Sequence, residues 1–420
     1  MQLLYRLFLR LYHVGIRLAA LRSTKARRWI DGRRRLPEGL RRWRAGAPGK
    51  LLWMHCASLG EFEQGRPLLE AWRVARPDWQ ILLTFFSPSG YTVRHNYAGA
   101  NHVAYLPLDG KGRASAFLDA VRPDAAVFVK YEFWYYYLTG LRARGIPTVL
   151  IAAVFRPGQP FFRWYGGLHR EMLSCFAHVF VQDRQSAEAL SAFEVPVTVA
   201  GDPRIDRVQD IVRVAPARPL IERFCATHPV LIAGSTWKPD LELLRDWAQD
   251  TRYAHWRLII APHEVGTFRS PAGDFVAPTG GPWAFGEPLA YYSQPETIDQ
   301  ARILVIDNVG MLSSLYCYAR IVYVGGGFGA GIHNTLEPMA FGRPVLFGPR
   351  HEKFPEARYL DGFPATGKVV NAADFKRKFD YLTEDETVYA QACERSWAYL
   401  QAHAGATERI LAWMRARWTS

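Results

Sequence analysis

Residues 324–338 read VGGGFGAGIHNTLEP and directly follow a short apolar run. The five glycines of this stretch allow a backbone to approach a ligand closely, and a helix expected to begin near Thr335 would direct its N-terminus at the same space. Glu337 is a candidate to accept hydrogen bonds from a ribose. The glycine spacing fits neither the dinucleotide-binding fingerprint nor a P-loop. We therefore expect a ligand-binding turn whose ligand is not fixed by the glycines alone.

Apolar runs and amphipathic segments alternate on both sides of this stretch. Such alternation is typical of βαβ units, which build a parallel sheet covered by helices on both faces. The apolar runs fall into two series, so the sequence predicts an α/β fold with two Rossmann-like domains. The expected strands are residues 51–56, 80–85, 102–106, 125–129, 148–152 and 178–181 in the first domain, and 229–233, 257–261, 302–306, 321–324 and 344–347 in the second.

The length of 420 residues also favours two domains over one core. An irregular connector is expected between Arg207 and Leu220, because residues 212–219 read VRVAPARP. Residues 270–300, rich in Gly, Pro and aromatic side chains, are expected to form a long loop. The predicted parts are residues 1–48, a first domain at 49–207, a second domain at 208–400, and a C-terminal helix at 401–420 that packs back on the first domain.

Positive charge is concentrated at the N-terminus. Residues 1–50 hold 14 Lys and Arg against Asp31 and Glu38, which leaves 38 basic and 37 acidic groups for the remaining chain. A nearly neutral body argues against a nucleic-acid partner, which would require basic groups over the folded binding face. The five cysteines lie far apart, without metal-ligand or redox spacing, and are expected to be reduced. No metal and no cofactor are predicted.

Residues 3–21 are predicted to form an amphipathic helix. Arg6, Arg10, His13 and Arg17 share one helical face, and Leu, Phe and Ile side chains occupy the opposite face. This pattern suits a helix in the headgroup region of a membrane better than one that crosses it. The basic residues that follow would strengthen docking on an anionic cytosolic leaflet. A helix packed on the protein's own body, with a solvated basic face, is the alternative.

Candidate chemistry in the first domain lies just after the predicted strands, where open α/β sheets bind ligands. Glu61 falls in the first turn of a helix, where an anion is stabilised and remains available as a proton acceptor. Glu132 follows another buried strand, and Arg204 is a candidate to stabilise charge on a departing phosphate. Further candidates on the acceptor side are Ser58, Gly60, Ser89 and Gly90.

Taken together, these motifs resemble the 3-deoxy-D-manno-octulosonic acid (Kdo) transferase family over about residues 50–400. The resemblance is carried by residues 53–61, 84–90, 132–134, 233–236 and 325–338, with Gly348, Pro349 and Phe354, and its most specific part is the segment HNTLEP. It implies a GT-B fold, CMP-Kdo as donor and a lipid A precursor as acceptor, at the cytoplasmic face of the inner membrane. It also implies Glu61 as the general base, and Glu132 and Arg204 as transition-state support. The CMP-Kdo contacts it implies are Ser235, Thr236, Pro262, His263, Val309, Gly310, Met311, Gly326, Gly327, His333, Asn334, Thr335, Leu336 and Glu337.

The chain departs from the family pattern at three positions. His263 stands where an arginine is usual, Met311 where a glutamate is usual, and Trp237 where a histidine is common. These changes remove a guanidinium and a carboxylate from the predicted donor site. A transferase that uses another nucleotide sugar, such as a UDP-sugar, is therefore an alternative, and a non-catalytic membrane adaptor is a second. An NAD-dependent oxidoreductase is disfavoured because its fingerprint is missing from the sequence.

Overall fold

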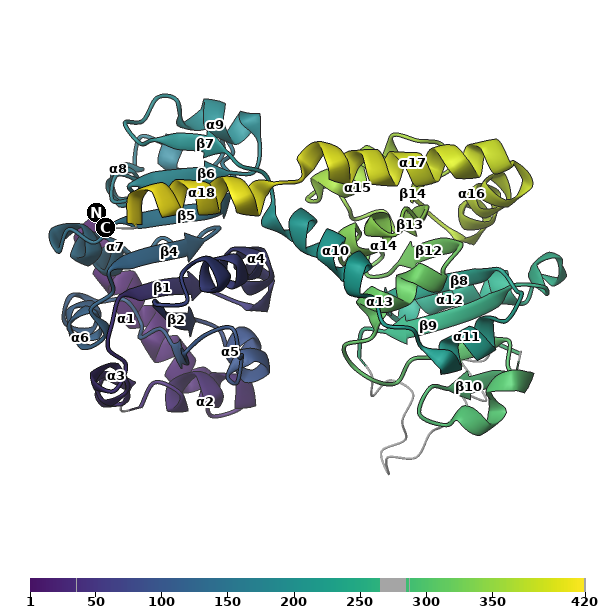
Figure 1. Cartoon of the computed structure of the whole chain (residues 1–420), viewed down its shortest axis with the longest axis horizontal. Helices are drawn as coiled ribbons and strands as arrows, with labels where there is room; N and C mark the ends of the chain where they lie inside the picture. Colours follow the sequence, from purple (N-terminus) through teal and green to yellow (C-terminus); the bar gives the residue numbers. More distant parts are fainter. Residues whose placement is uncertain (35, 265–284, 287, 419–420) are drawn as a thin grey trace. The chain divides into compact units, whose positions relative to one another are not determined.

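The computed structural model describes residues 1–34, 36–264, 285–286 and 288–418 (Figure 1). The chain divides into two compact units. Unit 1 comprises Met1–Asp206 and Ala404–Ser420, and unit 2 comprises Arg207–His403. Each unit contains one seven-stranded sheet whose neighbouring strands all pair in parallel.

The sheet of unit 1 has the order β3-β2-β1-β4-β5-β6-β7. Its central strand β1 pairs with β2 and β4, so that Met54 lies opposite Leu83 on one side and Val127 on the other. All six residues of β1 are buried, which explains its continuous apolar pattern. The strands are β1 (Leu51–Cys56), β2 (Gln80–Phe85), β3 (His102–Tyr105), β4 (Ala125–Val129), β5 (Thr148–Ala153), β6 (His178–Val181) and β7 (Val197–Val199).

Helices cover both faces of this sheet. One face packs against α3, α6, α7 and α8, and the other packs against α4 and the C-terminal α18. The carboxylate of Asp206 accepts hydrogen bonds from the backbone N–H groups of Gly405 (2.6 Å) and Thr407 (2.7 Å), and so caps α18. The helices are α1 (Gln2–Ala19), α2 (Thr24–Asp31), α3 (Leu36–Ala45), α4 (Leu59–Ala75), α5 (Pro88–Arg94), α6 (Lys111–Val121), α7 (Tyr135–Ala143), η1 (Pro160–Phe162), α8 (Gly167–Leu173), α9 (Arg184–Leu190) and α18 (Ala406–Trp418).

The sheet of unit 2 has the order β10-β11-β9-β8-β12-β13-β14. Its core joins the inner strands to aromatic side chains of α12 and α16, among them Trp247 and Phe379. The strands are β8 (Val230–Thr236), β9 (Arg257–Pro262), β10 (Leu289–Tyr291), β11 (Ile303–Val305), β12 (Ile321–Val324), β13 (Val345–Phe347) and β14 (Gly367–Lys368). The helices are α11 (Pro219–Cys225), α12 (Lys238–Ala248), η2 (Thr251–Tyr253), η5 (Pro295–Gln300), α13 (Leu312–Leu315), η6 (Tyr316–Tyr318), α14 (Leu336–Ala340), α15 (Pro355–Asp361), α16 (Ala372–Glu384) and α17 (Glu386–His403).

Two predictions about connecting segments need correction. The connector expected between Arg207 and Leu220 is irregular only after Val214, because α10 (Pro203–Val214) runs through the point where the units divide. The loop predicted at residues 270–300 lies partly outside the described residues, and its described part contains β10 and η5. Proline at the start of α10 and of η5 supplies the fixed φ that begins a helix, and of these two prolines Pro295 lies within the segment that was predicted to be a loop.

The apolar side chains of α1 divide between the body and the surface. Leu9 is buried and Tyr5 and Ile16 are half-buried against unit 1, whereas most other large apolar side chains of the helix are exposed. The exposed ones are Leu3, Leu4, Leu7, Phe8, Leu11, Tyr12, Val14 and Leu18. Among the described residues no helix has the length and apolarity needed to cross a membrane.

Candidate functional site

The strand order of each sheet reverses at its centre, between β1 and β4 in unit 1 and between β8 and β12 in unit 2. Loops that follow the strands on either side of such a point diverge and leave a ligand-binding crevice at the carboxyl ends of the strands. We call the loops after β1, β2 and β4 the first rim. The loops after β8, β9, β12 and β13 are the second rim.

Glu61 lies on the first rim, in the first turn of α4. Ser58 occupies the N-cap position of this helix, and its hydroxyl donates a hydrogen bond to Oε2 of Glu61. Gly60 is exposed, and a Cβ added there would lie 3.8 Å from the Ser58 hydroxyl oxygen. The carboxylate is thus partly exposed, oriented by a neighbouring hydroxyl, and placed at the positive end of a helix.

Glu132 follows β4 and is nearly buried. Its Oε2 lies 2.9 Å from Nε2 of His55 and accepts a 2.7 Å hydrogen bond from the indole N–H of Trp134. On the other side of the His55 ring, Nδ1 lies 2.9 Å from the hydroxyl oxygen of Thr84. That oxygen also accepts a 2.8 Å hydrogen bond from Trp53. Strands β1, β2 and β4 therefore jointly hold one oxygen of this carboxylate.

Sequence reasoning missed His55 as a part of this site. The available signal was a single imidazole inside the otherwise apolar strand LLWMHC. A completely buried histidine requires a partner for each ring nitrogen. The sequence did not reveal that one partner would be Glu132, which lies 77 positions away.

Arg204 is held by its neighbour Asp202. The guanidinium donates from Nε (2.9 Å) and Nη2 (2.6 Å) to Oδ2 of that carboxylate. Burial raises the pKa of Asp202, but the adjacent Arg204 charge and its hydrogen bonds lower it further, so that the net shift is downward. The pair fixes the orientation of Arg204 at the start of α10.

The loop after β2 has a different role at each of its two predicted residues. Ser89 is exposed in the first turn of α5, and its backbone N–H donates to the Ser87 hydroxyl. Gly90 is buried, and a Cβ there would lie 2.2 Å from the ring of Phe85. Gly90 therefore allows α5 to pack closely on β2. Ser89 presents its hydroxyl group to solvent.

Close packing between loops accounts for the glycines of the second rim. A Cβ on Gly325 would lie 2.5 Å from the Ser235 carbonyl oxygen, and one on Gly327 would lie 2.5 Å from Cα of Gly348. Gly326 has a φ of +93°, which favours glycine. The glycines that were predicted to approach a ligand thus first allow the loops after β8, β12 and β13 to approach one another.

Asp240 ties the second rim together and was also missed from the sequence. Its buried carboxylate accepts hydrogen bonds from the Tyr323 hydroxyl (2.6 Å) and from the backbone N–H groups of Trp237 (2.8 Å) and Gly326 (3.0 Å). Burial raises the pKa of Asp240, and these three hydrogen bonds oppose the rise. The side chain connects α12, β12 and the glycine-rich loop.

Three rings gather on the second rim, one from each of three loops. His263 stacks on Trp237 with ring centroids 4.6 Å apart and on His333 at 4.4 Å. The indole N–H of Trp237 donates to Nε2 of His333 at 3.0 Å, which requires a neutral imidazole protonated at Nδ1. Burial, and secondly the neighbouring His263, lower the pKa of His333 to about 4. The residues that replace the usual Arg and His therefore form one stacked group.

Asn334 and Glu337 also contact each other. The Asn334 amide donates to Oε1 of Glu337 at 3.0 Å, and its oxygen accepts from the backbone N–H of Leu336 at 3.1 Å. Burial raises the pKa of Glu337, while the Asn334 hydrogen bond and the Arg207 charge act in the opposite direction. Helix α14, predicted to begin near Thr335, begins at Leu336 and has five residues.

Two buried threonine hydroxyls on the second rim have no hydrogen-bond partner among the described residues. They belong to Thr236, at the end of β8, and Thr335, at the N-cap of α14. Ser235 beside Thr236 has a positive φ of 54°. The two hydroxyls lie on either side of the point where the strand order reverses, between β8 and β12. A bound ligand could form the hydrogen bonds that they lack.

The remaining predicted contacts of unit 2 differ in exposure. Val309 is 88% exposed, Gly310 has a φ of +95°, and Met311 is buried at the N-cap of α13. Pro262 is buried at the end of β9. Within the part of the chain that the structure describes, no three His, Cys, Asp or Glu side chains lie close enough together to hold a metal ion.

Comparison with known proteins identifies relatives over most of the chain. A profile of the family described as 3-deoxy-D-manno-octulosonic-acid transferase (kdotransferase) matches residues 33–207. A 3-deoxy-D-manno-octulosonic acid transferase of Bordetella pertussis is 27% identical over 94% of this chain and 97% of its own length. One from Chlamydia muridarum is 24% identical over 84% of this chain and 83% of its own.

Comparison with solved structures shows which known fold the chain resembles. The crystal structure of UDP-GlcNAc 2-epimerase from Neisseria meningitidis bound to UDP-GlcNAc superimposes with a TM-score of 0.60 at 13% identity. The match covers 86% of this chain and 98% of that one. At this identity the likeness concerns only the architecture, which is the GT-B-type arrangement of two α/β domains with parallel sheets.

Proposed function

We propose, because this chain belongs to the 3-deoxy-D-manno-octulosonic acid (Kdo) transferase family, that it transfers Kdo from CMP-Kdo to a lipid A precursor with inversion at the anomeric carbon. Its family makes the chain a glycosyltransferase. The identities of the donor, the acceptor and the catalytic residues are what we propose. The observation that supports the proposal most is the position of Glu61. It is a partly exposed carboxylate at the carboxyl end of the central strand of unit 1, hydrogen-bonded by Ser58.

In the proposed reaction Glu61 takes the proton from a hydroxyl of the acceptor sugar. The hydroxyl oxygen attacks the anomeric carbon of Kdo, and the bond between that carbon and the phosphate oxygen breaks on the opposite face. CMP leaves with the bonding electron pair. One carboxylate that activates the nucleophile is sufficient for such a single displacement.

Glu132 and Arg204 have supporting roles in this proposal. His55 and Trp134 both form hydrogen bonds with Oε2 of Glu132. Because the carboxylate is rigid, these contacts also fix the position of Oε1. Asp202 orients the Arg204 guanidinium in the same way. Charges that are oriented before the reaction stabilise a transition state without a reorganisation cost.

The second rim is the proposed CMP-Kdo site. The unpartnered hydroxyls of Thr236 and Thr335 would form hydrogen bonds with the phosphate or the sugar of the donor. Asn334 and Glu337 would form hydrogen bonds with its ribose. His333 would present an Nδ1–H donor, because Trp237 occupies its other nitrogen. The imidazole of His263 stands where the family uses a guanidinium.

Replacement of Glu61 by Gln tests the catalytic proposal. We expect transfer of Kdo to fall by roughly 10²–10⁴-fold, while CMP still raises the melting temperature as it does for the wild type. Transfer is measured by the mass of the lipid product after incubation with CMP-Kdo. Glu70→Gln is the matched control, since Glu70 lies on the same helix and its carboxylate pairs with Arg66. A Glu61→Gln enzyme with wild-type turnover would refute the role.

A donor other than CMP-Kdo is favoured by one observation: Trp237 and His263, which replace family residues, stack with each other, and His263 also stacks on His333. The rise in melting temperature with CMP, compared with UMP at equal concentration, separates the two donors. CMP should give the larger rise. A larger rise with UMP would move the assignment to a uridine nucleotide sugar.

Membrane association is proposed through residues 1–48. The exposed apolar face of α1 and the net positive charge of this segment suit a helix lying in the headgroup region of an anionic bilayer. Flotation with phosphatidylglycerol vesicles should recover the wild type but lose the double variant Leu7→Asp, Leu11→Asp. Equal flotation of the two proteins would contradict the proposal.

A further inference from the structure

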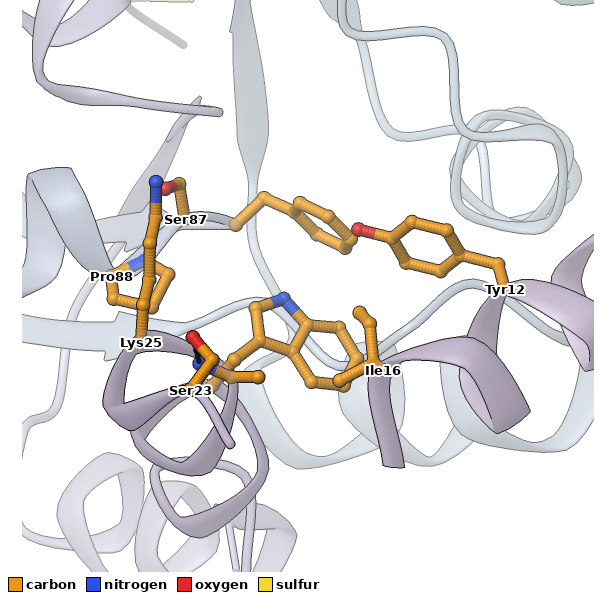
Figure 2. Close-up of a pocket in the computed structure, with 9 residues that line it drawn as sticks. Tyr12, Ile16, Ser23, Lys25, Ser87 and Pro88 are labelled. Atoms are coloured by element: carbon orange, nitrogen blue, oxygen red, sulfur yellow. Dashed lines mark hydrogen bonds between the residues drawn. The ribbon is translucent and has the colours of Figure 1, made fainter. Parts of the chain in front are cut away.

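A cavity of about 310 Å³ lies in unit 1 between the N-terminal helices and the loop after β2 (Figure 2). Its apolar wall consists of Tyr12 and Ile16 from α1, Trp29 from α2, and Phe86 and Pro88 from the loop and the start of α5. The rings of Tyr12 and Phe86 stack at 6.2 Å, and Trp29 meets Phe86 edge to face at 5.6 Å. A site of this volume is at the small end of ligand pockets and suits one slender apolar group.

Polar groups accompany the apolar wall. Ser23, Lys25 and Ser87 line the same cavity (Figure 2). Trp29 is only 5% exposed, and its indole N–H has no hydrogen-bond partner among the residues that the structure describes. Buried N–H donors are normally paired, so an acceptor oxygen that entered the cavity, from a ligand or from water, would satisfy this group. The cavity therefore suits a molecule with an apolar chain, a carbonyl oxygen near that chain, and an anionic group.

Arg33 holds the wall of the cavity in place. Its guanidinium donates to the carbonyl oxygens of Phe86 (2.6 Å), Trp29 (2.8 Å) and Leu106 (2.8 Å), and it stacks over the Trp29 ring at 3.8 Å. Burial lowers the pKa of Arg33 to about 9, so the group remains a cation at neutral pH. Helix α2 is thus fastened to the ends of β2 and β3, and the cavity is part of the folded structure.

The cavity adjoins the first rim. The backbone N–H of Ser87 donates to the carbonyl oxygen of Ala57 at 2.7 Å, one residue before the N-cap of the helix that carries Glu61. The ring of Phe86 packs at 4.6 Å on Trp134, which donates to Glu132. A molecule anchored in the cavity would extend its polar end over the residues proposed for catalysis.

We propose that this cavity binds one acyl chain of the lipid acceptor. The ester or amide carbonyl of that chain accepts the hydrogen bond of Trp29, and a phosphate of the acceptor faces Lys25. The inference rests on the proposed function for the identity of the acceptor. It adds a specificity-determining site, in which the acyl chain positions the acceptor sugar at Glu61.

Kinetics with acylated and deacylated acceptor test the proposal. Ala26 lines the cavity on α2, and Ala26→Trp would fill it. We expect this variant to raise KM for the tetra-acylated acceptor about tenfold or more, and to leave KM for the fully deacylated disaccharide bisphosphate unchanged. Ala116→Trp is the matched control, because Ala116 lines a separate cavity to which Trp29 also contributes. Equal KM changes for the two acceptors, or none with Ala26→Trp, would overturn the proposal.

A milder variant covers the case in which Ala26→Trp fails to fold. Trp29→Phe keeps an aromatic wall and removes the N–H group. It should raise KM for the acylated acceptor about threefold to tenfold, with kcat nearly unchanged, as expected for a lost hydrogen bond in substrate binding. An unchanged KM in a folded Trp29→Phe enzyme would count against the hydrogen bond and thus against the proposed binding mode.

Photocrosslinking separates this inference from the proposed function. A tetra-acylated acceptor with a diazirine at a chain end should label peptides containing residues 12–29 and 86–88 of the wild type, and should label Ala26→Trp much less. Labelling without any Kdo transfer would reject the function and keep the cavity as a lipid site. Transfer without this labelling would reject the cavity. Equal competition by phosphatidylglycerol vesicles and by unlabelled acceptor would also reject it, since any membrane lipid would then be the occupant.

Discussion

The two rims lie at equivalent places in two parallel sheets, yet they are built from different chemistry. The first rim presents carboxylates, each oriented by hydroxyl, imidazole or indole groups, as at Glu61 and Glu132. The second rim consists of glycine loops in contact with one another, with a buried aspartate beneath them. The first rim should therefore be sensitive to the loss of single atoms. The second should be sensitive to atoms that are added.

Adding one methyl group to the second rim should have the largest effect. In Gly327→Ala the new Cβ would lie 2.5 Å from the backbone of Gly348, which cannot move as a flexible side chain can. We expect the free energy of unfolding to fall by about 1–3 kcal/mol, with loss of the stabilisation that the proposed function predicts for CMP. Denaturant titration with and without CMP measures both effects.

Gly329→Ala is the matched control for that prediction. It lies in the same loop, and its nearest neighbour, the Gly326 carbonyl oxygen, would be 3.5 Å from the added Cβ. This variant should retain wild-type stability and CMP binding. If both alanine variants behave alike, close packing does not explain the glycines of the second rim.

Removing a side-chain partner from the first rim should have the next largest effect. His55→Leu leaves Oε2 of Glu132 with the Trp134 hydrogen bond but without the imidazole. We expect kcat to fall about tenfold, because a nearly buried carboxylate that loses a donor changes its orientation or its solvation. KM for CMP-Kdo should stay within about twofold.

His178→Leu is the control for His55→Leu. His178 is also buried in the sheet of unit 1, on β6, where Nε2 lies 2.8 Å from the hydroxyl oxygen of Thr198 and no candidate carboxylate is near. Its loss should leave kcat unchanged at permissive temperature. A similar fall of kcat in the two variants would attribute the effect to weakened packing and not to Glu132.

Sequence patterns predicted the central strands of both sheets because these are buried on both faces and read as continuous apolar runs. The strands β7, β10 and β14 were missed, since each is a short strand at a sheet edge with at least one side chain that is not buried, so it does not read as a continuous apolar run. The candidate residues after β1, β4 and β12 could be found because ligands of parallel sheets bind at the carboxyl ends of strands.

Long-range partners could not be predicted in the same way. His55 and Glu132, or Asp240 and Gly326, meet only because the strands that contain or precede them are neighbours in a sheet. Local sequence gives the position of a residue on a strand or a turn and does not give its partner 77 or 86 positions away. The stacking of Trp237 with His263 was hidden for the same reason, although each departure from the family was visible singly.

The smallest expected effect concerns pH and the stacked rings of the second rim. His333 has a pKa of about 4 in the folded protein, lowered first by burial and then by His263, against about 6.5 in an unfolded chain. Between these values the unfolded state binds a proton that the folded state does not. The contribution of His333 to the free energy of unfolding is therefore fully present above pH 6.5 and declines as the pH falls towards 4. His333→Gln removes this contribution. From pH 7 to pH 4.5 the melting temperature of the wild type should therefore fall by roughly 2–4 °C more than that of the variant, measured without nucleotide. Parallel melting curves over this range would mean that His333 is protonated within the stack, and that the Trp237 hydrogen bond does not hold it neutral.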